Sequence, residues 1–385
     1  MLPLTELEVT RYRGLRDLSL RGLGRVNLLV GRNNSGKTSV LEAISLAANP
    51  LDPMTWRRVA IGREPSVLGP RRSYVERLRW LFPQHASEGP DTSSDGNIKL
   101  ASAGRSPVRV VEARYQPLRG AIDALPPRPG TRDEGVTDGE PDFSSERRGT
   151  QIDVEVVLDP GSRAEESSRR ARETFTWWEW ANYVVTQPSP EGLITQVITP
   201  YDHWFRGLPT QMYSDMRAEG AGDDVIRLLS RVDPRIVGLE VLATRSGAAP
   251  HAAPGAELFL RDRSAGLLPV GAFGDGMRRI LLMALGVTRA RGGVLLIDEI
   301  ETAIHVSVLG HVFRWIVEAC AANDVQLFVT THSLEAIDAI LAADTTPEED
   351  IVGYRLDPTE TTVSAHRYGE DLLKRLRFER GADVR

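Results

Sequence analysis

The chain of 385 residues is 41% hydrophobic and 26% charged. Its formal net charge is −6, so bulk charge does not favour a polyanion partner, although local patches can still be basic. Cys320 is the single cysteine, which excludes an internal disulfide and a cysteine-based zinc cluster. The sequence has neither an apolar run of about 18 residues that could span a membrane nor an N-terminal secretion signal, and we therefore expect a cytoplasmic protein.

The N-terminal part of the chain predicts a strand–loop–helix unit. Two short strands are expected in ELEVT and LRDLSL, followed by a buried strand over residues 25–30 and a helix whose apolar spacing begins at residue 39. Between them, GRNNSGKTS at residues 31–39 fits the P-loop pattern G-x-x-x-x-G-K-S/T. The setting is the one that a P-loop requires. The motif alone does not separate kinases, GTPases, motors and transporters.

The chemistry of this loop predicts a site for ATP and Mg²⁺. Glycines let the backbone approach a phosphate closely, and successive N–H groups form an anion nest at the start of the helix. Lys37 is expected to reach the β- and γ-phosphates, and the Thr38 hydroxyl to bind Mg²⁺. The residues expected to bind the nucleotide here are Gly31, Asn33, Asn34, Ser35, Gly36, Lys37, Thr38 and Ser39.

The middle of the chain predicts mixed structure with long loops. Residues 71–82 read as a helix, and strands are expected in PVRVVEARYQ, QIDVEVVLD and ETFTWWEWANYVV. Stretches rich in Gly, Pro, Ser and acidic residues between Pro83 and Thr150 are expected to be surface loops. The tryptophans of WWEW could stack on bases, but packing in a β-rich segment is the plainer interpretation. Residues 223–242 begin as a helix and turn at Asp233-Pro234.

A second group of candidate site residues follows in the last third of the chain. GGVLLIDEIE at residues 292–301 is an apolar run ending in two acids, which is typical of a buried parallel strand whose carboxyl end faces a ligand. Asp298 is expected to hold Mg²⁺, and Glu299 to orient the attacking water. In FGDGMRRILLMALGV, glycines open a helix suited to phosphate. The strand VQLFVTTHS ends at His332, a candidate contact for the γ-phosphate.

The order of these motifs resembles the ABC-type ATPase head, and within it the RecF/SMC/OLD branch of AAA-type ATPases. The resemblance is to an OLD-like ATPase without a Toprim nuclease domain. It is carried by both ends of the chain and not by the middle. The resembling segments are RYRGLRDLSL, VNLLVGRNNSGKTSVLEAI, FGDGMRRILLMAL, VLLIDEIETAIH, FVTTHSLEAI and GADVR.

This resemblance implies an α/β fold of the P-loop NTPase class, with a mixed β-sheet flanked by helices. The head would be discontinuous, formed by residues 1–84 and 230–385, with a β-rich and loop-rich insertion at 85–229. Two heads would sandwich two ATP molecules as a homodimer. Gly274, Asp275 and Gly276 of one subunit would complete the nucleotide site of the other.

The resemblance leaves the roles of four further residues open. Gln84 stands where a lid glutamine could fall, but a surface glutamine is the commoner case. Arg278 or Arg279 could act as an arginine finger, or both could be surface residues of the helix. His305 could lie at the dimer seam or simply start a helix.

Three functional hypotheses remain. The first is an ATP-driven dimeric switch in DNA repair or anti-phage defence, working with a separate effector such as a nuclease and acting on DNA. The second is an ATP-gated regulator or scaffold of a protein effector that does not bind DNA. The third is the ATPase subunit of a transporter, which is disfavoured because Gly271-Ala272-Phe273 lacks the serine of an LSGGQ-like loop. After His332 we expect a helix, two strands and a helix rather than a nuclease domain.

Overall fold

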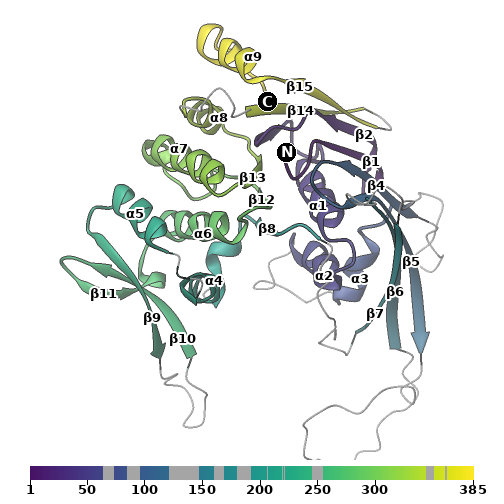
Figure 1. Ribbon diagram of the computed structural model, residues 1–385, viewed down its shortest axis with the longest axis horizontal. Helices are drawn as coiled ribbons and strands as arrows, with labels where there is room; N and C mark the ends of the chain where they lie inside the picture. The colour runs from purple at the N-terminus through teal and green to yellow at the C-terminus, as the bar shows by residue number, and fades with distance from the viewer. Residues whose placement is uncertain are drawn as a thin grey trace, which may run out of the picture.

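Three β-sheets organise the protein, as Figure 1 shows for the computed structural model of residues 1–385. Most of the chain is described by this structure, and all statements below concern that part. The described residues are 1–63, 73–84, 96–120, 147–159, 169–179, 192–205, 207–218, 220, 222–244, 255–343, 351–359 and 362–385.

The central sheet has six strands and is mixed. All neighbouring strands are parallel except the edge pair β15–β14, which is antiparallel. Its three central strands, β3, β12 and β13, are short, largely apolar runs that are buried along their whole length, as expected for parallel strands covered on both faces. In sheet order the strands are β15 (Val363–Tyr368), β14 (Ile351–Pro358), β3 (Val26–Val30), β13 (Gln326–Thr330), β12 (Val294–Ile297) and β8 (Thr195–Ile198).

Helices cover the two faces of this sheet unequally. Alternate strand residues such as Leu28, Leu295 and Leu327 pack into one core with a group of helices, drawn in green at the left of Figure 1. Leu29, Leu296 and other residues of the opposite face pack against α1 (Lys37–Ala48), which directly follows the P-loop. The helices of the first core are α4 (Gly207–Ala218), α5 (Asp223–Val232), α6 (Asp275–Arg289), α7 (Val306–Ala322) and α8 (Leu334–Leu341).

A second six-stranded sheet, wholly antiparallel, covers the other side of α1. Helix α1 is therefore buried between two sheets, and it shares this layer with α2 (Pro53–Ile61) and α3 (Tyr74–Arg79) (Figure 1). In sheet order the strands are β2 (Leu15–Arg21), β1 (Glu6–Tyr12), β4 (Asn97–Ala103), β5 (Val108–Gly120), β6 (Arg147–Leu158) and β7 (Arg169–Trp178).

Two smaller parts complete the fold. A three-stranded antiparallel sheet packs beside α4 and α5 and consists of β11 (Gly266–Pro269), β10 (Gly255–Asp262) and β9 (Ile236–Thr244). Short helical turns are η2 (Asp202–Trp204), η3 (Val270–Ala272), α9 (Glu370–Lys374) and the π-helical η4 (Arg375–Glu379). The hydroxyl of Tyr354 on β14 donates a 2.9 Å hydrogen bond to the Arg21 carbonyl at the end of β2, which ties the two large sheets together.

The expected fold class is confirmed: the chain is an α/β protein with a mixed sheet, flanking helices and the strand–P-loop–helix unit at residues 26–48. The region expected as an insertion, 85–229, contributes β4–β7 to the sheet that β1 and β2 begin, and β8 to the central sheet. Strand pairing over such distances is not readable from local sequence, which is why these strands looked separate. The domain boundaries stay a prediction.

Individual residues behave mainly as the plainer interpretations predict. Trp177 is 1% exposed and packs against Phe175, with ring centroids 5.7 Å apart, so its indole is a core group rather than a surface for bases. Trp180 lies outside the described residues. Cys320 is buried in α7, and burial raises the pKa of its thiol. In the described part of the chain, none of the helices combines the length and the apolar character needed to cross a membrane.

The position of α1 between two sheets makes its packing a test of the fold. Leu46 is fully buried there. We expect Leu46→Ala to lower the free energy of unfolding by about 2–5 kcal/mol because it leaves a cavity. Leu372→Ala removes the same side-chain atoms at a site that is 41% exposed, and it should cost less than about 1 kcal/mol. Urea unfolding of both variants measures the difference, and equal losses would contradict this packing.

Candidate nucleotide-binding site

The loop between β3 and α1 is built on residues with positive φ. Gly31 has φ of 142° and Gly36 has φ of 92°, which side chains rarely adopt. A Cβ on Gly31 would lie 2.6 Å from the Leu356 carbonyl oxygen, and one on Gly36 would lie 2.7 Å from a methyl carbon of Leu15. Both positions therefore require glycine for steric as well as conformational reasons. Asn34, with φ of 63°, supplies a third left-handed turn, which asparagine tolerates.

Two polar residues of the loop, Ser35 and Lys37, are buried. The Lys37 ammonium donates to the carbonyls of Gly31 at 2.8 Å and Arg32 at 2.9 Å, so it lies across the loop that it belongs to. Burial lowers the pKa of Lys37, and the carboxylates of Asp298, Glu299 and Glu301 oppose that shift. The Ser35 hydroxyl is buried and has no hydrogen-bond partner among the described residues. A buried polar group without a partner is costly, and a bound phosphate would supply one.

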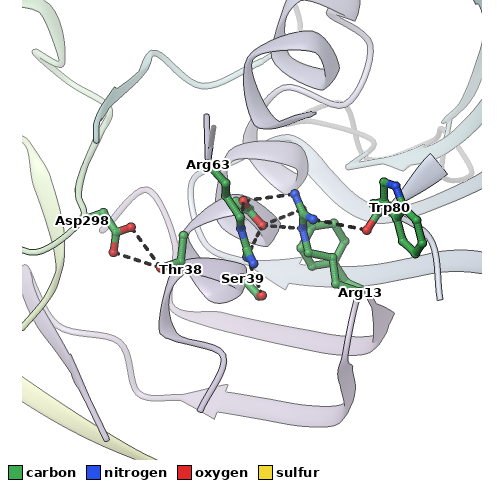
Figure 2. Close-up of polar contacts among 8 residues, drawn as sticks. Arg13, Thr38, Ser39, Arg63, Trp80 and Asp298 are labelled. Carbon is green, nitrogen blue, oxygen red and sulfur yellow. Dashed lines mark hydrogen bonds and ion pairs between the residues drawn. The ribbon is translucent and has the colours of Figure 1, made fainter. Parts of the chain in front are cut away.

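The acid at the end of β12 reaches the first turn of α1. The Thr38 hydroxyl lies 3.0 Å and 3.2 Å from the two carboxylate oxygens of Asp298, and Figure 2 draws both contacts. The hydroxyl of Thr330, the last residue of β13, donates to the same carboxylate at 2.6 Å. One carboxylate and two hydroxyls supply hard oxygen donors, the type that Mg²⁺ prefers. The residues present therefore fit a magnesium ion beside the P-loop.

Glu299 is held in an unusual backbone conformation. Its φ is 47°, in the left-handed region that glutamate rarely adopts. The Glu299 N–H donates to the Thr330 hydroxyl at 2.8 Å, and the Thr302 hydroxyl donates to its Oε2 at 3.1 Å. Strain of about 1–3 kcal/mol at such a residue persists only where the surrounding contacts enforce it. The half-buried carboxylate is thereby fixed beside Asp298.

His332 lies at the same edge, because the parallel strands β3, β12 and β13 all end there. The N–H of the next-door Thr331 donates to the Leu29 carbonyl of β3 at 3.3 Å, which brings the His332 segment to the start of the P-loop. The structure thus collects the P-loop, Asp298, Glu299 and His332 at one edge of the sheet.

The glycine-rich start of α6 forms a separate, exposed surface. Gly274 and Asp275 are exposed, and the Asp275 carboxylate pairs with the Arg278 guanidinium within the first turn. A Cβ on Gly276 would lie 2.9 Å from the Ala303 carbonyl oxygen, so this turn packs closely on the segment that follows the acid pair. Residues 274–276 make no hydrogen bond to the P-loop within the described part of the chain.

Arg279 has an internal role that the sequence did not reveal. Its side chain is fully buried and donates to the backbone carbonyls of Thr199, Asp298 and Glu299. Burial lowers its pKa to about 10. A guanidinium in this position fixes the backbone of the acid pair, Asp298 and Glu299. It does not reach outward, so Arg278 is the member of the pair that faces the surface.

Two other open residues take structural roles here. The Gln84 amide donates to the carbonyls of Arg79 at 3.1 Å and Phe82 at 2.9 Å, and it thereby closes the end of α3. The Nδ1 of His305 accepts from the Ser307 N–H at 3.3 Å, so the imidazole caps the start of α7. Both observations favour the structural alternatives that the sequence left open.

A buried acid ties α1 to its surroundings just beyond Thr38. The Glu42 carboxylate, on a side chain that is 9% exposed, accepts from the Tyr12 hydroxyl at 3.0 Å. It also pairs with Arg13 and Arg63, each at 2.7 Å. Arg63 reaches on to the Ser39 hydroxyl at 2.8 Å, while Arg13 also donates to the Trp80 carbonyl (Figure 2). Strand β1, helix α1 and the end of α2 therefore meet at one carboxylate.

Several residues of this site were missed by the sequence analysis. Thr330 follows an apolar strand as a polar residue, and Glu42 interrupts an apolar helix, so each carried a weak signal. Glu301 accepts the His332 N–H at 2.8 Å, and it belongs to the quoted acid segment without having been singled out. Their partners lie far away in sequence, which local patterns do not report.

Comparison with known families identifies the chain. A family model described as "AAA domain, putative AbiEii toxin, Type IV TA system" matches residues 128–338, which is more than half of the chain. The chain belongs to this AAA_21 family. Membership agrees with the predicted ABC-type ATPase of the RecF/SMC branch, whereas the OLD-like label stays a prediction.

Individual relatives of this AAA_21 protein are distant. A protein of Methanocaldococcus jannaschii described as uncharacterized is 33% identical over 115 residues, which cover 29% of the chain and 98% of that protein. The DNA replication and repair protein RecF of Pseudomonas syringae is 33% identical over 122 residues, or 32% of the chain and 27% of RecF. The match thus spans about a quarter of RecF. An SMC head bound to the C-terminal winged-helix domain of ScpA aligns at 14% identity with a TM-score of 0.47, covering 95% and 98% of the two chains.

The Glu42 cluster provides a test of the site's support. Glu42→Ala leaves the largely buried Arg13 without its counter-ion, and we expect the free energy of unfolding to fall by about 3–5 kcal/mol. Glu8→Ala breaks the exposed pair of Glu8 with Arg21, and it should cost about 0–1 kcal/mol. Urea unfolding compares the two, and a Glu42→Ala loss no larger than that of Glu8→Ala would refute the buried cluster.

Proposed function

We propose that this AAA_21 protein binds Mg-ATP at the P-loop and hydrolyses it. The carrying observation is the contact between the Thr38 hydroxyl and the Asp298 carboxylate at 3.0 Å, since it joins the P-loop to the acid strand. Family membership supports an ATPase-type domain. Three features support binding of phosphates in particular. Gly31 and Gly36 have no room for a Cβ, the buried Ser35 hydroxyl has no partner among the described residues, and the Lys37 ammonium lies across the loop.

The residues divide the work of binding. Loop N–H groups and Lys37 bind the phosphates, with Asn33, Asn34, Ser35 and Ser39 lining the loop. Thr38 and Asp298 hold the magnesium ion, and Thr330 fixes the carboxylate by its 2.6 Å hydrogen bond. When bound, the ion neutralises charge on the phosphate oxygens. Burial lowers the pKa of Lys37, and the nearby carboxylates of Asp298, Glu299 and Glu301 oppose that shift.

Glu299 and His332 are the proposed catalytic residues. The Thr302 hydroxyl and the strained backbone hold the Glu299 carboxylate in one orientation. Its Oε1 has no hydrogen-bond partner among the described residues, and it would accept the proton of the attacking water. His332, at the neighbouring strand end, would donate a hydrogen bond to the γ-phosphate.

A homodimer would use the exposed start of α6. Two heads facing each other would bring Gly274, Asp275 and Gly276 of one subunit to the ATP of the other. The exposure of Gly274 and Asp275 at the N-terminus of a 15-residue helix supports this arrangement, because N–H groups there attract anions. ATP would close the dimer and hydrolysis would open it, as a timed switch in the cytoplasm.

The switch would act on DNA, in repair or in defence against phage, through a separate effector such as a nuclease. The similarity to RecF, whose name refers to DNA replication and repair, supports a DNA partner. The family description, which names a toxin of a toxin–antitoxin system, supports a defence role. The alternative is an ATP-gated regulator of a protein effector without DNA binding, which the absence of any DNA effect on turnover would favour.

The lysines of this chain offer a matched test of ATP binding. Lys37→Ala removes the charged group that spans the loop, and ATP affinity should fall about 10- to 100-fold, as for loss of a charged hydrogen bond. Lys99→Ala, at an exposed pair with Glu112, should bind ATP as the wild type does. Calorimetric titration measures both, and unchanged affinity in Lys37→Ala would overturn the site assignment.

Glu299→Gln separates binding from turnover. The amide cannot take a proton from water, so we expect turnover to fall about 100-fold or more, with ATP affinity preserved. Scattering should detect an ATP-bound dimer that persists longer than that of the wild type. Glu173→Gln, on the exposed part of β7, serves as control. Wild-type turnover in Glu299→Gln would exclude this carboxylate as the base.

Adding duplex DNA distinguishes a switch that acts on DNA from a regulator of a protein effector. If the switch acts on DNA, steady-state turnover should rise several-fold when duplex DNA is added, and Lys37→Ala provides the blank. Turnover that is indifferent to DNA would count against the DNA-acting switch. Co-purification of a stoichiometric protein with the Glu299→Gln form would then support the protein-gated alternative.

A further inference from the structure

The backbone of His332 is held by two side chains, and neither of them belongs to the P-loop or to the acid pair. Its N–H donates to the Oε1 of Glu301 at 2.8 Å, and its carbonyl accepts from the guanidinium of Arg385 at 2.8 Å. Both peptide groups of the residue are therefore occupied. The neighbouring Ser333 is also fixed, since its hydroxyl caps α8 by accepting from the Ala336 N–H at 3.1 Å.

The imidazole of His332, unlike its backbone, has no hydrogen-bond partner among the described residues. The side chain is half-buried. A histidine packed for stability usually satisfies at least one ring nitrogen within the protein. A fixed backbone with an unengaged ring is instead the arrangement expected where the ring must meet a ligand.

Glu301 links His332 to the acid segment. It stands two residues after Glu299, and its carboxylate is near enough to Lys37 to oppose, with Asp298 and Glu299, the lowering of the Lys37 pKa by burial. One oxygen accepts the His332 N–H, while Oε2 is buried without a partner among the described residues. An acid kept in such a place costs stability, which suggests a role that a neutral apolar residue would not fill.

Arg385 contacts the His332 carbonyl from the segment after η4, residues 380–385, which we call the tail. Its guanidinium forms a two-bonded pair with Asp383, at 3.0 Å and 2.9 Å, which leaves one terminal nitrogen for the His332 carbonyl. Val384 between them is 3% exposed and packs into the helical core. Arg377 pairs with Asp338 of α8 at 2.7 Å and also donates to the Ala382 carbonyl. The tail is thus fixed to the helix that His332 precedes.

We propose that Glu301 and Arg385 are positioning residues that hold His332 for its contact with the terminal phosphate of ATP. The inference rests on the proposed function, because it takes His332 to act in hydrolysis. Both residues act through the His332 backbone and touch no substrate themselves. A displacement of about 1 Å at a catalytic group lowers rates up to about 100-fold. Loss of either contact should therefore lower kcat while ATP affinity, set by the P-loop, stays constant.

The test is a set of substitutions made in two backgrounds. In the wild-type background, Glu301→Ala and Arg385→Ala should each lower kcat about 10-fold or more, with the Kd of ATP within about twofold. In the His332→Ala background the same substitutions should have no further effect on kcat, because the ring they position is gone. A merely structural role would lower kcat or stability equally in both backgrounds.

A conservative variant separates the hydrogen bond from the charge. Glu301→Gln keeps an oxygen that can accept the His332 N–H, and it should retain kcat within about threefold. A loss as large as that of Glu301→Ala would show that charge matters instead and would overturn the positioning role. Arg380→Ala, an exposed arginine of the same tail, is the matched control for Arg385→Ala. Glu301→Gln also keeps the test valid if Glu301→Ala does not fold.

The outcomes separate this inference from the proposed function. Wild-type turnover that is abolished in Lys37→Ala supports the ATPase whatever happens at Glu301. Multiplicative losses in the His332→Ala background overturn the positioning inference alone. Normal kcat in His332→Ala itself overturns both the positioning inference and the catalytic role of His332, while the assignment of the ATP site to the P-loop stands. Absence of turnover in the wild-type protein overturns both the positioning inference and the proposed function.

Discussion

The contact between Thr38 and Asp298 is the constraint on which the rest of the site depends. The two residues are 260 positions apart, and they meet because α1 starts and β12 ends at the same edge of the central sheet. An oxygen–oxygen distance of 3.0 Å leaves little tolerance, so the strands between them need a fixed register. Thr330 and Arg279 maintain that register by hydrogen bonds to the side chain and backbone of Asp298. The proposed cation site, made of residues so far apart in the sequence, would exist only in the folded chain.

Helix α1 connects the candidate site to the antiparallel sheet. Its first turn belongs to the site, while its later turns lie between two sheets and carry Glu42 into the cluster with Tyr12 and Arg13. Breaking a buried pair is much more costly than breaking an exposed one, so the cluster holds the helix in position more firmly than surface ion pairs could. The β-rich middle of the chain thus packs behind the candidate nucleotide site and supports it through α1.

The candidate residues of the site could be named from the sequence, whereas the residues that support them could not. The P-loop, the acid pair and His332 were readable because each follows an apolar strand and has a distinctive residue type. Thr330, Glu42 and Glu301 escaped notice because their importance lies in partners far along the chain, which periodicity does not report. Arg279 illustrates the same limit, since surface and buried arginines look alike in a helix pattern. The pairing of β4 with β1 likewise needed long-range information.

Strand β3, which leads into the P-loop, has consequences for how the protein is made. Its two neighbours in the sheet, β13 and β14, come from residues 326–330 and 351–358. During synthesis the P-loop strand therefore leaves the ribosome about 300 residues before either neighbour, and it cannot pair with β13 or β14 until they have been made. Formation of the proposed nucleotide site thus has to wait for residues 326–358. A growing chain that has not reached β13 carries the GRNNSGKTS motif without the strands that hold it in place.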